Sequence, residues 1–338
     1  MKIQLIILCL ICIGLLGCSD KVQDISTAYN DSVNMLDNGP RDDKSEELKS
    51  DFKDGDISTN VDENTGIESD YIKNINAIYV ERPVERSKKE ILQRLEKLGE
   101  TDPVIKEIKE NASLYPDRML EALANNPEMA DFVFGYTDTD NNSKAEFSEK
   151  EIKQDFPLFL QWDPRWGYKK YGYNSNIGLA GCGPTCLSMV LFYLTRDETL
   201  TPDKIAEYSM EHGYYVKGTG TAWSLMSDVP AIYGINSFNP GMSEDSLKAE
   251  LDRDRVIICA MNKGDFTVAG HFIVIYGYKK EGFMVNDPNC VSRSRRLWTY
   301  EELSWQVKNI WSFGKGGAKE QKIDGNSEIY MLYDVQDR

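Results

Sequence analysis

The stretch that decides the expected fold is GCGPTCLSMV, residues 181–190. From Cys186 to Tyr193 the chain is apolar except for one serine, which predicts a buried helix. Pro184 suits the first turn of that helix, because the backbone N–H groups there have no partner within the helix. Cys182 then lies at the helix start, where free N–H groups and the positive end of the dipole favour a thiolate over a thiol. Cys182 is therefore a candidate nucleophile, and the alternative is a small buried residue in a tight turn.

The chain has two histidines, and their contexts differ. His212 precedes Gly213 at the end of a helical pattern over residues 202–210, so we expect it to end a helix. His271 opens an apolar run that predicts a strand over residues 272–278. A histidine in that place can direct its ring at the start of a neighbouring helix. His271 is thus the candidate general base for a cysteine nucleophile.

Two more polar residues complete the candidate catalytic set. Asp287 lies sixteen positions after His271 and follows a short strand predicted over residues 283–285. A carboxylate there could orient the imidazole ring and stabilise its charged form. Gln161 lies in the stretch FLQWDPRW, and its side-chain amide could join the backbone N–H of Cys182 as an oxyanion donor. A polar surface residue is the simpler interpretation of Gln161 taken alone.

Residues 156–338 have the pattern of an α+β domain, because short apolar runs alternate with aromatic and glycine-rich turns. We expect helices over residues 186–193 and 202–210, and strands over residues 256–261, 272–278, 283–285 and 329–333. A helix followed by several antiparallel strands is the outline that results.

Four motifs in order, QWDPRWG, GCGPTCLSMV, GHFIVIYGY and NDP, resemble the papain-like domains of peptidase family C-thirty-nine. This is the bacteriocin-processing or double-glycine group, and the resemblance is to its stand-alone branch over about residues 156–315. It implies a papain-like cysteine peptidase fold, with the cysteine on an N-terminal helix and the histidine and aspartate on an antiparallel sheet. It also implies four roles: Gln161 in the oxyanion hole, Cys182 as nucleophile, His271 as general base and Asp287 as orienting residue.

The resemblance predicts a thiol hydrolase that cleaves peptide or amide bonds in a peptide or protein substrate, with no metal or organic cofactor. Well-studied members of the family are cytoplasmic domains of export transporters, whereas the first 18 residues of this chain predict a secretory signal. Their double-glycine specificity is therefore not carried over. Two other functions stay open. An acyltransferase or transglutaminase-like enzyme would use the same triad, and a surface binding module would keep the fold without turnover.

The first 18 residues, MKIQLIILCLICIGLLGC, predict a secretory signal, with Lys2, an apolar run, and small residues before a cysteine. The end of this segment resembles the lipobox of bacterial lipoproteins. It implies that Cys18 is lipidated and anchors the secreted protein at the extracytoplasmic face of the bacterial cell membrane. An uncleaved signal anchor is the alternative. Residues 19–84 follow as an acidic, flexible tether, with 15 acidic and 5 basic side chains between residues 19 and 70.

Residues 85–155 predict a small helical region and a linker. A capping box at Ser87 and Glu90 opens the first helix, and Pro103, Pro116 and Pro127 each suit the first turn of a further segment. We expect this region to pack against the following domain. Its last part contains an EF-hand-like spacing, which predicts either a calcium site or a solvated acidic linker. The four residues of that spacing are Asp138, Asp140, Asn142 and Glu149.

The overall composition excludes some functions. A net charge of -16 argues against nucleic acid as a partner, because nucleic-acid binding needs a basic face. Outside the signal segment only four cysteines remain, too few and too scattered for a disulfide framework. An isolated disulfide between two of them stays open at this stage. These four residues are Cys182, Cys186, Cys259 and Cys290.

Overall fold

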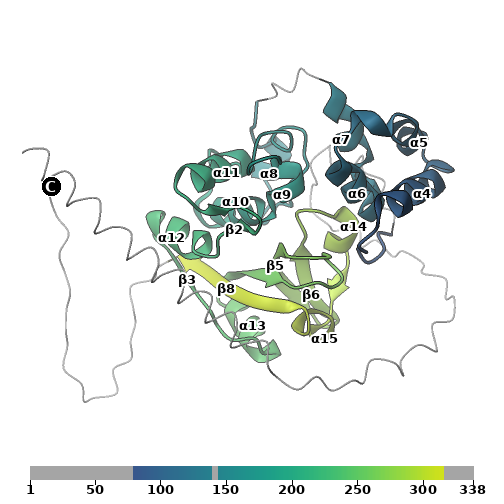
Figure 1. Cartoon of the computed structure of the whole chain (residues 1–338). Coiled ribbons are helices and arrows are strands. Elements are labelled where there is room, and N and C mark those ends of the chain that lie inside the picture. The colour runs from purple at the N-terminus through teal and green to yellow at the C-terminus, as the bar shows by residue number, and fades with distance from the viewer. Residues whose placement is uncertain (1–78, 139–143, 316–338) are drawn as a thin grey trace, which may run out of the picture. The chain divides into compact units, whose positions relative to one another are not determined.

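The computed structural model describes residues 79–138 and 144–315 (Figure 1). Cys18, the tether up to residue 78 and the strand expected over residues 329–333 lie outside the described residues. So do Asp140 and Asn142, and the calcium hypothesis therefore stays a prediction. Within the described ranges no helix is both long and apolar enough to cross a membrane. The same ranges contain no group of three His, Cys, Asp or Glu residues placed to bind a metal ion.

The first described segment forms short helices joined by 3-10 turns. The α-helices are α4 (Lys88–Gly99), α5 (Pro103–Glu110), α6 (Asp117–Asn125) and α7 (Ala130–Phe134). The 3-10 turns are η1 (Ala112–Leu114), η2 (Pro127–Met129) and η3 (Gly135–Thr137). The predicted capping box is confirmed, since Ser87 and Glu90 each accept the other's backbone N–H. Pro103 opens α5 and Pro127 opens η2, as their sequence positions predict. Pro116 is instead the N-cap of α6, one residue before its first turn.

The second part of the chain combines helices and strands. Its helices are α8 (Glu149–Ile152), α9 (Ile177–Ala180), α10 (Cys182–Thr195), α11 (Pro202–Glu211), α12 (Leu225–Ile232), α13 (Glu244–Leu251), α14 (Val291–Ser294) and α15 (Tyr300–Ser304). Its strands are β1 (Tyr215–Val216), β2 (Gly220–Thr221), β3 (Ile235–Phe238), β4 (Val256–Met261), β5 (His271–Lys279), β6 (Gly282–Asn286), β7 (Leu297–Trp298) and β8 (Val307–Lys315). The expected helices and three of the expected strands are confirmed, β4 with the predicted bounds.

Six of these strands form one antiparallel sheet in the order β3-β8-β4-β5-β6-β7. Strand β8 was not predicted. Its apolar residues are interrupted by Lys308, Asn309 and Gly314, so the sequence has no clear strand period there. In the sheet β8 nevertheless occupies a central place between β3 and β4, where Trp311 lies opposite Ile258. Pairing on both edges compensates for the weak local pattern.

The sheet is buried on both faces. Ile258 and Val274, which pair across β4 and β5, pack into a core with residues of α10. Their neighbours Ile257 and Ile273 point the other way, into a second core that includes residues of α13 and α15. Figure 1 shows α10 and α13 on opposite sides of the strands. Alternate residues therefore contact different layers, as strand geometry requires, and the expected α+β class is confirmed.

The helical region shares a core with the second part of the chain. Leu160 and Trp162 are buried together with apolar residues of α4 to α7. Phe132 of α7 fills the space beside Gly167 and Gly178, where any β-carbon would collide with its ring. The helices thus pack against the segment around Gln161 and against the turn that precedes Cys182.

Candidate active site

Cys182 is the first residue of α10, a helix of 14 residues that is almost completely buried. Gly181 occupies the N-cap position and provides no side chain, so no side-chain acceptor covers the first N–H groups of the helix. Such groups stabilise negative charge at the helix start. Cys182 is partly exposed, whereas Cys186, Cys259 and Cys290 are buried, and all four are free thiols. A disulfide among them is therefore excluded, and Cys182 is the accessible thiol of the described residues.

The two glycines beside Cys182 permit close contacts. A β-carbon on Gly181 would lie 2.5 Å from the Ile177 side chain, and one on Gly183 would lie 2.6 Å from Oγ1 of Thr221. Thr221 is in β2, and its hydroxyl lies 2.8 Å from the hydroxyl of Tyr171. Strand β2 is thereby held directly against the start of α10. The GCG sequence is explained by this packing on both sides of the cysteine.

His271 begins β5 and is almost completely buried. Its Nε2 lies 2.7 Å from Oδ1 of Asp287, which leaves Nδ1 for the Cys182 thiol. Burial by itself would lower the pKa of His271, but the charge of Asp287 and hydrogen bonds with Asp287 and Cys182 raise it to about 9. The raised pKa favours the imidazolium form at neutral pH, and an imidazolium beside a cysteine stabilises its thiolate.

Asp287 directly follows β6 and is fully buried. Its Oδ1 accepts hydrogen bonds from His271 and from the backbone N–H of Asn289, and its Oδ2 accepts one from Nε of Arg293 at 2.6 Å. Burial opposes ionisation, yet the positive charges of Arg293 and His271 lower the pKa of Asp287 to about 2. The carboxylate therefore stays charged and has donors on both oxygens.

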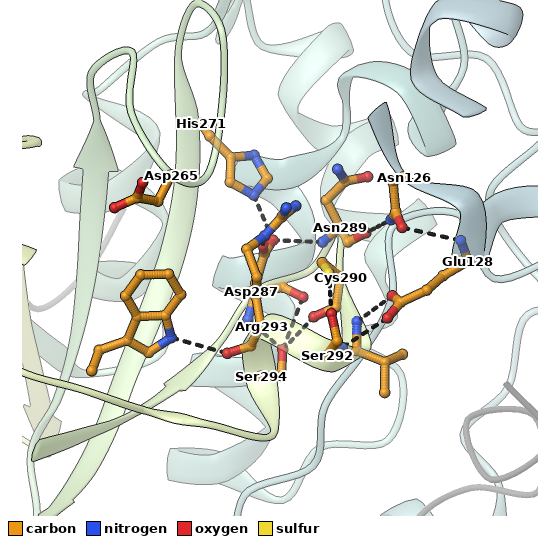
Figure 2. Close-up of polar contacts among 12 residues, drawn as sticks. Asn126, Glu128, Asp265, His271, Asp287, Asn289, Cys290, Ser292, Arg293 and Ser294 are labelled. Carbon is orange, nitrogen blue, oxygen red and sulfur yellow. Dashed lines mark hydrogen bonds and ion pairs between the residues drawn. The ribbon is translucent and has the colours of Figure 1, made fainter. Parts of the chain in front are cut away.

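Arg293 is the residue of this site that the sequence analysis missed. It lies in α14 and is almost completely buried. Figure 2 shows its guanidinium against Asp287. Three arginines occur between residues 293 and 296, and no local pattern distinguishes the one that turns inward. Arg293 gives the buried Asp287 carboxylate a second cationic partner, and it donates to the oxygen that His271 does not contact.

Gln161 is buried, so its interpretation as a surface residue is wrong. Its backbone N–H donates to the carbonyl of Pro288 at 2.7 Å, which brings it beside Asp287. Its side-chain Nε2 donates to the carbonyl of Gly178 at 2.8 Å, in the short helix before Cys182. One N–H of the amide is therefore engaged and the other remains for a further acceptor.

The second histidine, His212, is the C-cap of α11 and stacks on Tyr208, as the sequence predicts for a helix end.

Comparisons with known proteins concern this part of the chain. Residues 153–316 match the Peptidase_C39 like family. One similar solved structure is the peptidase domain of Streptococcus ComA, a bifunctional ABC transporter involved in a quorum-sensing pathway. The two chains are 16% identical, with a TM-score of 0.32, and the alignment covers 44% of this chain and 99% of that chain.

Another is described as a C39-like peptidase from Bacillus anthracis, with 16% identity and a TM-score of 0.31 over 51% of this chain and 100% of that chain. No curated protein matches the chain significantly. The family match includes Cys182, His271 and Asp287, and it supports a relationship of this segment to the C39-like peptidases.

Proposed function

We propose that this protein is a cysteine peptidase that uses Cys182, His271 and Asp287. The observation that supports it best is the buried contact of His271 with Asp287, with the Cys182 thiol as the other partner of the ring. A histidine that carries a proton at neutral pH, beside a partly exposed cysteine at a helix start, suits acyl transfer through a thioester. The family match favours peptide bonds as the target.

In the proposed reaction the Cys182 thiolate attacks the carbonyl carbon of the peptide bond and forms a tetrahedral oxyanion. His271 gives its Nδ1 proton to the departing amine as the C–N bond breaks, which leaves a thioester. A water then loses a proton to His271 and attacks the thioester. The C–S bond breaks, the carboxylic acid product leaves, and the thiolate and imidazolium are restored. Throughout the cycle Asp287 keeps the ring oriented.

The oxyanion needs donors that are in place before the reaction. The backbone N–H of Cys182 at the start of α10 is one candidate. The free N–H of the Gln161 amide is the other, since its remaining N–H is fixed by the carbonyl of Gly178. This bond also determines the orientation of the amide, because rotation by 180° would place Oε1 against a carbonyl oxygen.

A covalent probe tests the proposal. The purified protein is incubated with a peptidyl chloromethyl ketone, and the modified residue is identified by peptide mass spectrometry. We expect one adduct on Cys182, which is lost in His271→Ala, together with cleavage of a mixed peptide library by the untreated protein. Absence of both adduct and cleavage in a folded sample would contradict the peptidase function, while acceptor-dependent amide formation without cleavage would favour an acyltransferase.

The pH dependence of kcat/KM should show a basic limb near pH 9. His271 has its pKa raised from the ordinary 6.5 to about 9, so it retains the proton for the leaving amine up to that pH. The same sign applies to stability: the contribution of the charged ring is complete below about pH 6.5 and disappears as the pH rises through about 9. Initial rates between pH 5 and pH 10, at roughly constant ionic strength, measure this limb. A limb near the ordinary histidine value would contradict the proposed ion pair.

We also propose that the peptidase is anchored to the extracytoplasmic face of the membrane through Cys18, on the basis of the signal and lipobox sequence. Cys18→Ser should abolish fatty-acid labelling and release the protein from the membrane fraction, because firm anchoring depends on the attached acyl chains. Metabolic labelling with a palmitate analogue and fractionation measure both effects. Labelling that persists in Cys18→Ser would show that the lipid is attached elsewhere or that the lipobox interpretation is wrong.

A further inference from the structure

Glu128 is a buried carboxylate in the helical region, outside the segment that matches the peptidase family. It belongs to η2, and its side chain is 7% exposed. Its two oxygens accept the backbone N–H groups of Val291 and Ser292 at 2.7 and 2.8 Å. These are the first two residues of α14, so Glu128 caps from a distance the helix that contains Arg293.

Neighbouring residues fix the same loop from the same side. The side-chain amide of Asn126 and the indole N–H of Trp162 both donate to the carbonyl of Asn289. The other end of the Asn126 amide accepts the N–H of Glu128, which positions that carboxylate. Figure 2 shows one connected path from Glu128 through Asn126 and Asn289 to Asp287. The helical region therefore binds the backbone of the loop directly, as well as packing against it.

The loop in turn determines where Arg293 lies. Nε of Arg293 donates to Asp287, whereas its buried Nη1 and Nη2 have no hydrogen-bond partner among the described residues. The Arg293 guanidinium is thus anchored by Asp287, while Glu128 holds the backbone of the two residues directly before Arg293. In the series Glu128, Arg293, Asp287 and His271, carboxyl groups alternate with basic groups. Burial raises the pKa of Glu128 above its usual value, while the two N–H donors and Arg293 oppose that rise.

We propose that Glu128 is a positioning residue of the active site, acting through the start of α14 on Arg293 and through Arg293 on the Asp287–His271 pair. An effect of Glu128 on catalysis rests on the proposed function as a cysteine peptidase. The positioning of His271 by Glu128 can be tested without measuring turnover. It assigns to the helical region a part in the reactivity of Cys182. Deletion of the negative charge at Glu128 should loosen Asp287 and thereby the ring of His271.

Glu128→Gln is the decisive variant, because it keeps the size of the side chain and changes its chemistry. An amide has one acceptor oxygen, so its NH₂ group would face either the N–H of Val291 or that of Ser292. The start of α14 must then move or lose a bond. Glu250→Gln is the matched control. Glu250 is also 7% exposed, and it bonds Ser312 and Arg255 at the end of β4 remote from His271.

The experiment uses the full chain and two measurements. The first is the second-order rate of Cys182 alkylation by iodoacetamide at pH 7, followed on the Cys182 peptide by mass spectrometry. The second is nuclear magnetic resonance of protein labelled with ¹⁵N-histidine, in which only His212 and His271 give ring signals. Thermal unfolding of each variant shows that it is folded.

We expect Glu128→Gln to lower the alkylation rate about tenfold, since small displacements of positioning groups have effects of this order or larger. The low-field proton on Nε2 of His271 should move upfield and exchange faster with solvent, while the His212 signals stay unchanged. Glu250→Gln should lower the melting temperature but change neither measurement. Unchanged His271 signals in folded Glu128→Gln, or equal effects of the two variants, would overturn the inference. Failure of the wild-type protein to react with the peptidyl probe would instead overturn the peptidase function and leave the histidine signals as the test of Glu128.

Discussion

Cys182→Ala should lower kcat/KM for peptide hydrolysis by about 10⁶-fold, the scale reached when a catalytic nucleophile is removed from a hydrolase. Cys186→Ala should retain much of the activity. The two cysteines lie about one turn apart on the same helix. Cys182 is partly exposed at the helix start, beside the ring of His271 with its raised pKa. Cys186 is completely buried, and that burial raises the pKa of its thiol well above the usual value. We therefore expect position within one helix to separate a reactive thiol from an inert one.

Alkylation at low pH measures this difference directly. Iodoacetamide near pH 6 should modify Cys182 first, and the loss of activity should follow the modification of that residue. Circular dichroism of Cys182→Ala provides the control, because a small partly exposed side chain contributes little to the core. Modification of Cys186 first, or wild-type turnover in Cys182→Ala, would show that the nucleophile is assigned wrongly.

Asp287→Asn should have the second largest effect, a loss of activity on the order of 10⁴-fold, as for other carboxylates that orient a catalytic histidine. Papain-like sites can use an amide in this role, but here both oxygens of Asp287 accept hydrogen bonds from N–H donors. An asparagine would direct its NH₂ group either at Arg293 or at His271. It would also leave Arg293 as a buried cation without its carboxylate partner, which costs about 3 kcal/mol or more of stability.

The double variant Asp287→Asn, Arg293→Leu tests this reason. Removal of the guanidinium takes away both the opposing donor and the unpaired charge, so the double variant should be more stable than Asp287→Asn and about tenfold more active. Steady-state kinetics and thermal unfolding of the two single variants and the double variant form the cycle. Equal activity of Asp287→Asn and the double variant would indicate that the charge of the carboxylate, rather than its hydrogen-bond geometry, is the essential property.

Local sequence determined the helices and strands that are marked by a regular spacing of apolar residues or by a capping motif. The helix after Cys182, the strand β4 and the capped start of α4 are of this kind. It also selected the candidate residues, because cysteine at a helix start and histidine at a strand start are informative in a chain with two histidines. The sequence further predicted a secretion signal with Cys18, which lies outside the described residues.

Other features depend on residues that are distant in the chain. Strand β8 does not show a clear strand pattern in its own residues. It forms because it pairs with β3 on one side and β4 on the other. Arg293 is one of several neighbouring arginines, and only the fold shows which of them faces Asp287. Glu128 reaches a backbone N–H that is 163 positions away. A buried charge needs a partner but does not specify its place in the sequence, so only the tertiary packing pairs Arg293 with Asp287 and brings Glu128 to the N–H groups of α14.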